Sequence, residues 1–359
     1  MDKAMNICRE NLSSVTLYMK FSIKNAIRPI LGILTYFCLL PAVIHCCTAP
    51  SDPLMPSPAT FRTKVCLQQK ISDLESMDIF IFNDDIFQKL DCYQRFDDMD
   101  DWNGTVISGC GEKIMTAIAN SPYEKEDWYE LSSRSHLKSF SIRLEDEKKD
   151  NPVMTGEVNV SPDKDRFNRS DLRLAPLSSE IVLNSLCCDF SGRPYAGEKL
   201  SDVMVYLTNV NAESPFLEEE ERNPVRIINA GGFCEDDVEE FVHRDLIVRN
   251  IEEDVGAKVI YPDIRMRCYR NNLPEESPGA PFTRLVIQGT LAGTTYYWPI
   301  DINREDNGDG ISGGHRYTFD IRITRKGSFD PDRPIKAEDI VLRQSVSEWK
   351  EKERYEVVF

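Results

Sequence analysis

The sequence predicts an all-β protein made of two antiparallel β-sandwich domains with a few short helices. The chain has 359 residues, which is enough for about two domains of roughly 150 residues each. Apolar residues make up 41% and charged residues 29% of the chain, so it can bury a core. Short strand-like runs separated by turn-forming residues recur along the sequence, and this pattern is typical of sandwiches.

Strand signals begin early in the first half. The segment 77–83, MDIFIFN, has apolar residues on both sides of the pleat, which is typical of a strand covered on both faces. Asn83, Asp84 and Asp85 predict a turn, after which residues 86–96 return as a second strand. Further strands are expected at 62–69, 104–109, 112–119 and 138–144, with a short helix near 129–137.

The second half carries the clearest strand patterns. The segment 315–324, HRYTFDIRIT, alternates apolar and polar residues and predicts a half-buried antiparallel strand. Two β-rich runs within 284–300 flank Ala292-Gly293 and predict a hairpin. Further strands are expected at 180–190, 202–208, 225–229, 258–261 and 264–268, with a helix near 235–243.

The polar stretch 145–170 separates the two halves and is expected to be irregular. It contains two prolines, and regular structure is expected to resume near Pro176. We therefore predict an N-terminal sandwich domain at 61–175 and a C-terminal sandwich domain at 176–359.

Residues 1–46 predict a signal peptide for export. An uncharged apolar run at 29–44 follows a cationic segment, as in secretory signals. Counted from Met19, the cationic segment has an ordinary length, so Met19 is a candidate for the true start of translation. A retained transmembrane helix is the alternative, but it needs about 20 apolar residues and this run is shorter.

The apolar run ends at two adjacent cysteines, Cys46 and Cys47, as in bacterial lipoprotein signals. That resemblance implies acylation of Cys47, with Cys46 as the alternative, because histidine before Cys46 fits a cleavage site less well. Ordinary signal cleavage nearby, with both cysteines free, is the remaining interpretation. Residues 47–60 contain four prolines and predict an extended tether between the lipid and the folded protein.

Composition excludes several classes of function. The net charge of −17 argues against a general basic face for nucleic acid or anionic lipid. From Cys47 on there are eight cysteines without any CxxC pair, so a structural zinc site is not expected. Most of these cysteines are predicted to be buried and unpaired, although one or two disulfides remain an alternative. No hydrolase or nucleotide-binding motif is found, and we predict no enzyme activity and no cofactor.

Two acidic segments, 97–102 and 301–310, are candidate calcium loops, but both fit solvated turns better and we predict no metal site. The four tryptophans are candidates for stacking on sugars, yet packing is the simpler interpretation. They are Trp102, Trp128, Trp298 and Trp349.

Several strings, in order, resemble the Bacteroidetes-type fimbrillin superfamily of exported pilus proteins. They are MDIFIFNDDIFQKLDCYQRF at 77–96, MTGEVNV at 154–160, LRLAPLSSEIVLNSL at 172–186, DVMVYLTNVNAES at 202–214, the segments 277–303 and 315–335, and the ending VSEWKEKERYEVVF at 346–359. The resemblance covers nearly the whole chain after the leader. It implies two transthyretin-like β-sandwich domains, a lipoprotein precursor anchored by palmitate, and assembly into surface fimbriae.

The resemblance also implies joining by strand complementation, in which a terminal strand of one subunit fills a groove in its neighbour. The candidate donor strand is formed by the last five residues, with Tyr355, Val357 and Phe359 on one face. An ordinary last strand of its own domain is the alternative. Major fimbrillins are cut after an arginine near the first strand, and Arg62 is the nearest match. A polar residue at a strand edge is the other interpretation of Arg62.

We therefore expect a structural subunit of cell-surface fimbriae, of accessory, anchor or tip type, that contributes to adhesion. Its expected partners are other fimbrial subunits, the outer membrane through the lipid, and a host or bacterial surface ligand, with no nucleic acid. The alternative is a glycan-binding outer-membrane lipoprotein of a nutrient-uptake system. An accessible terminal strand beside an apolar groove would favour the subunit, and exposed coplanar aromatic residues would favour the glycan binder.

Overall fold

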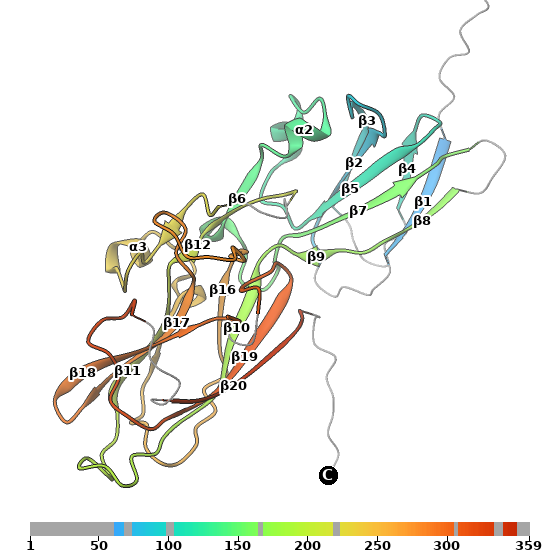
Figure 1. Cartoon of the computed structure of the whole chain (residues 1–359). Coiled ribbons are helices and arrows are strands. Elements are labelled where there is room, and N and C mark those ends of the chain that lie inside the picture. Colours follow the sequence, from blue (N-terminus) through green and yellow to red (C-terminus); the bar gives the residue numbers. More distant parts are fainter. Residues whose placement is uncertain are drawn as a thin grey trace, which may run out of the picture. The chain divides into compact units, whose positions relative to one another are not determined.

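A computed structural model of the chain describes residues 61–67, 74–97, 104–163, 168–217, 223–304, 308–333 and 340–349. All of them belong to one compact unit that extends from Ala59 to Phe359. Strands dominate it and helices are short, which confirms the predicted all-β class (Figure 1).

The strands of the first half are β1 (Phe61–Leu67), β2 (Met77–Asn83), β3 (Leu90–Phe96), β4 (Thr105–Ser108), β5 (Lys113–Ala119), β6 (Ser141–Arg143), β7 (Met154–Val160), β8 (Asn168–Leu172) and β9 (Ala175–Pro176). Its helices are η1 (Lys125–Trp128), α2 (Arg134–Leu137) and η2 (Leu144–Asp146). A five-stranded sheet has the order β3-β2-β5-β7-β9, and a three-stranded sheet has the order β4-β1-β8.

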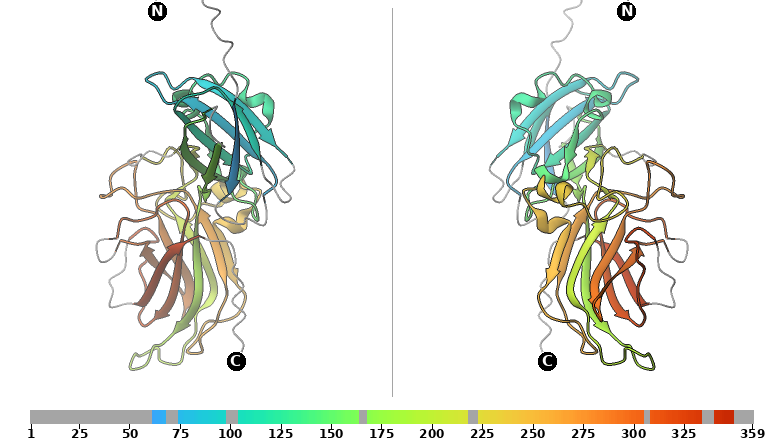
Figure 2. Two further views of the ribbon diagram at one scale, coloured as in Figure 1. Left: turned by 90° about the vertical axis from the view of Figure 1, so that its right-hand side faces the viewer. Right: turned by 90° about the vertical axis from the view of Figure 1, so that its left-hand side faces the viewer.

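The strands of the second half are β10 (Ser179–Cys188), β11 (Ser201–Thr208), β12 (Val210–Asn211), β13 (Glu213–Pro215), β14 (Ile227–Ile228), β15 (Val248–Ile251), β16 (Ile264–Cys268), β17 (Arg284–Leu291), β18 (Thr294–Asp301), β19 (His315–Ile323) and β20 (Ile340–Glu348). Its helices are α3 (Glu235–Glu239) and η3 (Arg244–Leu246). Two four-stranded sheets, β16-β10-β19-β20 and β15-β11-β17-β18, stack face to face (Figure 2).

Two strand pairs are parallel in these otherwise antiparallel sheets. β1 pairs in parallel with β8, and β10 pairs in parallel with β19. In both pairs a long stretch of chain intervenes between the partners, which permits the crossover that a parallel pair requires. The predicted hairpin is present as β17 and β18, and its turn residues Ala292 and Gly293 both have positive φ, as a two-residue hairpin turn demands.

Strand β2 is buried on both faces because it separates two hydrophobic cores. Phe80 and Phe82 belong to a large core that continues into the second half through residues such as Leu183 and Phe319. The opposite face of β2 belongs to a small core of the first half. The small core comprises Met77, Ile79, Ile81, Val106, Met115, Ala117, Ala119, Met154, Val160, Leu172 and Leu174.

Some local predictions were wrong. The stretch 145–170 is not irregular, because it contains η2, β7 and the start of β8; the polar residues of β7 are half-exposed or exposed, which makes that strand resemble a loop in composition. Residues 258–261 form no strand and contribute only a bridge between Ile260 and Leu186. The predicted division at 175/176 falls within β9, shortly before β10, and stays a prediction, since the large core runs through both halves.

The cysteines whose side chains the structure describes are unpaired; they are Cys92, Cys110, Cys187, Cys188, Cys234 and Cys268. Cys187 and Cys188 are both buried although they point to opposite faces of β10, because both faces of that strand are covered. Among the described residues there is no helix long and apolar enough to cross a membrane.

Candidate functional site

Strand β1 fills a gap between β4 and β8 (Figure 1). Its pairing with β4 is antiparallel and begins with Phe61 opposite Ser108; its pairing with β8 is parallel and ends with Leu67 opposite Leu172. We call the Phe61–Ser108 end of this sheet the outer end and the Leu67–Leu172 end the inner end. Both neighbours therefore offer backbone hydrogen-bonding groups to β1, which is paired along its two edges.

The small core lies beneath β1. Val106 of β4 and Leu172 of β8 flank the strand and are fully buried, and Thr63 of β1 itself is only 2% exposed. Removing β1 would leave two unpaired strand edges above a strip of apolar side chains. Such a strip is the acceptor that strand addition requires.

Three buried hydroxyl groups weaken the packing of this sheet. Thr63, Ser108 and Ser170 lie on β1, β4 and β8, and their hydroxyl oxygens have no hydrogen-bond partner among the described residues. A buried polar group without a partner costs about 1–3 kcal/mol. The three-stranded sheet is therefore less stable than its burial suggests, and sequence reasoning missed this because serine and threonine are unremarkable in strands.

Arg62 lies within β1, where its backbone is opposite Ile107 of β4. The parallel pairing with β8 starts at the next residue, Thr63. A cut after Arg62 would therefore release the chain that precedes it but leave Thr63–Leu67 between its two neighbours. Opening the whole groove would also require the remaining five residues of β1 to leave.

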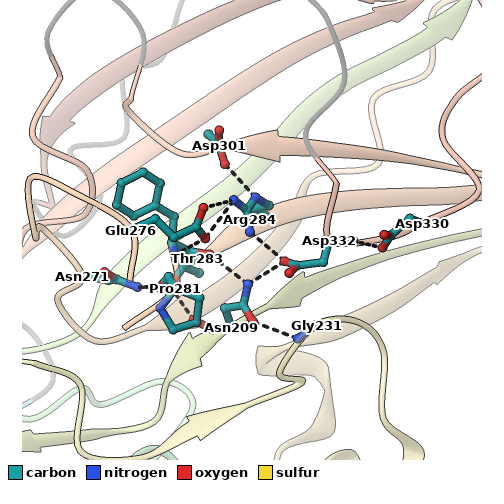
Figure 3. A network of polar contacts seen from close by, with 11 residues as sticks. Asn209, Gly231, Asn271, Glu276, Pro281, Thr283, Arg284, Asp301, Asp330 and Asp332 are labelled. Atoms are coloured by element: carbon teal, nitrogen blue, oxygen red, sulfur yellow. Dashed lines mark hydrogen bonds and ion pairs between the residues drawn. The ribbon is translucent and has the colours of Figure 1, made fainter. Parts of the chain in front are cut away.

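A second polar cluster surrounds Arg284 at the start of β17 (Figure 3). Its guanidinium group donates to both carboxylate oxygens of Glu276 at 2.9 and 2.8 Å, to Asp301 at 2.8 Å and to Asp332 at 2.6 Å. The Arg284 side chain is 2% exposed, and Asn209 donates a further hydrogen bond to Asp332 at 2.8 Å. This cluster joins β17, β18 and two loops that are distant in sequence.

The electrostatics of the Arg284 cluster fit a structural role. Burial raises the pKa of Asp301, and the attraction of Arg284 offsets only part of that effect. Burial also disfavours the charged form of Glu276, but hydrogen bonds from Arg284 and from the Phe282 amide hold its pKa below the ordinary value. Each carboxylate is engaged by the same cation, so the cluster is a clamp rather than a set of available acid–base groups.

A third polar group is buried where the two halves meet. Glu147 is 1% exposed; its Oε1 accepts hydrogen bonds from the Val153 amide at 3.0 Å and the Ser178 hydroxyl at 3.1 Å. Its other carboxylate oxygen and the hydroxyl of Tyr269 have no hydrogen-bond partner among the described residues. Burial raises the pKa of Glu147, while the charge of Arg267 opposes that shift.

The other predicted sites divide into two groups. Parts of both candidate calcium loops lie outside the described residues, and the described residues contain no group of three or more His, Cys, Asp or Glu that could hold a metal ion. The packing interpretation is confirmed for Trp128 and Trp298, which are buried, and Trp349 stacks on Arg267 with 4.7 Å from guanidinium carbon to ring centre. Trp102 lies outside the described residues, as do Cys46, Cys47, Tyr355, Val357 and Phe359.

No protein-family model and no curated protein sequence matches the chain. Several solved structures match the chain in fold. A proposed cell adhesion protein of Bacteroides eggerthii matches with a TM-score of 0.61 and 14% identity, over 81% of this chain and 96% of that protein. A fimbrilin of Porphyromonas gingivalis matches with a TM-score of 0.55 and 13% identity, over 81% of this chain and 98% of that protein. The chain has the fimbrillin-type fold.

A proposed cell adhesion protein of Parabacteroides distasonis shares the fimbrillin-type fold, with a TM-score of 0.57 and 13% identity over 81% of this chain and 96% of that protein. These three structural neighbours are one fimbrilin and two proposed cell adhesion proteins. At such identities the likeness concerns the fold. Within the fimbrillin-type fold of this chain, the gap filled by β1 is the candidate site.

Proposed function

We propose that the chain is a structural subunit of cell-surface fimbriae, of accessory, anchor or tip type, which joins its neighbours by strand complementation and contributes to adhesion. The observation that carries the proposal is β1, a first strand inserted between β4 and β8 above an apolar core. The fimbrial and cell adhesion proteins that share the fold support the same role.

The chain would donate its last five residues. Tyr355, Val357 and Phe359 share one face of a strand by the two-residue period, and a row of three large apolar side chains suits a groove like that beneath β1. Backbone hydrogen bonds to both edges of the groove would supply strength, and the apolar row would set the register.

The leader would place the subunit at the outer membrane. Acylation of Cys47, or of Cys46, would attach it there, since diacyl or triacyl chains give stable anchoring. As long as β1 stays in place, the groove is filled and the chain can donate a strand but not accept one. An uncut form would therefore act as the anchor, whereas loss of the chain up to Arg62, followed by displacement of the rest of β1, would make it an acceptor.

Deleting Tyr355–Phe359 tests the proposal. We expect export and acylation to continue, since the leader is intact, and the subunit to disappear from sheared fimbriae while it persists in membranes. Glu356→Gln, which leaves the apolar row unchanged, is the matched control and should assemble normally. Normal incorporation of the deletion variant would show that the terminal strand is not the donor. Its unfolding and degradation would show that the strand belongs to its own sandwich.

A further inference from the structure

The turn between β2 and β3 presents two large apolar side chains to solvent. Ile86 is 91% exposed and Phe87 is 65% exposed, although turn tips are ordinarily polar. The turn is well fixed: the Asp85 carboxylate accepts hydrogen bonds from the amides of Phe87 at 2.9 Å and Gln88 at 2.8 Å. An apolar pair held in place at the surface indicates a contact with another molecule.

This turn lies at the outer end of the β1 sheet. The amide of Asp84 donates to the carbonyl of Glu112 at 3.1 Å, one residue before β5 begins. Asp91 of β3 accepts a hydrogen bond from the Gly109 amide at 2.7 Å, one residue after β4 ends at Ser108. Since Ser108 is opposite Phe61, the turn and the start of β1 are at the same end (Figure 1).

The inner end of the same sheet is occupied by the chain itself. β8 runs towards β9, and the Leu177 amide then donates to Val153 at 2.9 Å. From there the chain enters β10, and Gly314 of the second half donates to Ser178 at 3.3 Å. A strand from another copy can therefore reach the gap between β4 and β8 only from the outer end, and it must run in the direction of β1.

The length of the link before the proposed donor strand limits how far away the donating copy can be. The amide of Trp349 donates to Gly314 at 2.8 Å, and Arg173 pairs with Glu348 at 2.6 Å, so the end of β20 is fastened to its own body. Only residues 350–354 separate Trp349 from the proposed donor strand. Five residues span at most about 18 Å.

Charge favours the same arrangement. The five-residue link of the donor reads KEKER and carries three basic and two acidic residues. Around the turn of the acceptor, the exposed acidic residues Asp84, Asp85 and Glu112 outnumber the exposed basic residue Lys89, whose ammonium group lies 5.9 Å from the centre of the Phe87 ring. The basic side chains of the link would pass over this acidic rim as the strand enters the groove, which favours a second copy of this chain as the donor.

We propose that the body of a donating second copy covers Ile86 and Phe87 when its terminal strand occupies the β1 position. This interface rests on the proposed strand complementation and adds a second contact to it. The terminal strand gives strength inside the groove, while the turn acts as a stop against which the donor body rests.

Photo-crosslinking in intact fimbriae tests the interface. The full chain carries p-benzoylphenylalanine at Ile86 or Phe87, and a matched control carries it at Tyr261, which is 72% exposed in the second half. We expect crosslinks from the turn to the body of a second copy and none from Tyr261. In parallel, the double variant with Ile86→Ser and Phe87→Ser should reduce incorporation about tenfold or more, since 1.4 kcal/mol of lost apolar burial suffices for that. Its thermal midpoint should remain that of the wild type, because both side chains are exposed in the free subunit.

The outcomes separate this interface from the strand exchange itself. If deletion of Tyr355–Phe359 abolishes assembly but the turn crosslinks to lipid, to a different protein or to nothing, the interface is overturned and strand complementation stands. Wild-type incorporation of the double variant would overturn it as well. If the deletion variant assembles normally, strand complementation fails first and the interface fails with it.

Discussion

Thr63→Val should stabilise β1 in its sheet. The substitution replaces a buried hydroxyl group that has no hydrogen-bond partner among the described residues by a methyl group of similar size. Both residues are β-branched, so the strand propensity at position 63 hardly changes. Removing an unsatisfied buried hydroxyl recovers part of the 1–3 kcal/mol that it costs, and we expect a gain of about 1 kcal/mol.

Hydrogen exchange of the β1 amides is the direct measurement. A gain of about 1 kcal/mol slows exchange about fivefold if β1 opens locally. Urea unfolding should show a higher midpoint with an unchanged slope, since the exposed surface is the same in both proteins. The same substitution should slow the replacement of β1 by a terminal strand, because β1 must leave before the strand can enter.

Thr63→Ser is the matched control. It keeps the hydroxyl group and removes a methyl group from a site that is 2% exposed, so it should destabilise β1 by about 0.5–1.5 kcal/mol. Faster exchange of the β1 amides in Thr63→Val would refute the reasoning. It would mean that the hydroxyl has a partner whose loss outweighs the removed desolvation cost.

Three further substitutions test the other structural features. Arg284→Ala should lower the free energy of unfolding by about 3–5 kcal/mol in urea titrations, because three carboxylates lose their shared cation, whereas Lys148→Ala, which removes an exposed pair with Glu75, should change it by under about 1 kcal/mol. Because the pKa of Glu147 is raised in the folded protein, the wild type should lose stability as the pH rises from the ordinary carboxyl pKa through the raised one. Glu147→Gln should remove this pH-dependent loss. If the stability difference between the two proteins stays constant across that pH range, the prediction is wrong. Gly156→Ala places a methyl group in steric clash with the Arg173 carbonyl oxygen, so thermal unfolding should occur at a lower temperature. An unchanged midpoint would show that β7 and the segment at Arg173 move apart at little cost.

The sequence predicts the strands whose pattern of apolar residues matches the burial of their two faces. β19 alternates because one face meets the large core and the other is half-exposed, and β2 is apolar throughout because both faces are covered. β7 is harder to recognise, because much of its length is half-exposed and its composition resembles a loop. Parallel pairing cannot be predicted from local patterns, since the partner of β1 lies about a hundred residues away in β8.

Only part of the candidate site can be predicted from the sequence. Resemblance located the first strand and Arg62, but the partners of β1 follow from tertiary pairing. The clamp around Arg284 joins residues from Asn209 to Asp332, so no spacing within a motif could reveal it. The apolar turn at Ile86 and Phe87 is visible in the sequence, but its exposure is not, because the same two residues would suit a strand.

The double-sided pairing of β1 determines how a joint at this position would respond to tension. A strand that enters from the outer end and runs along β1 would be pulled along its own axis. Backbone hydrogen bonds on its two edges lie across that axis, so they would be loaded together in shear rather than opened one after another. The joint would therefore resist a steady pull much better than a sideways peel, which suits a fibre held at one end and dragged by flow at the other.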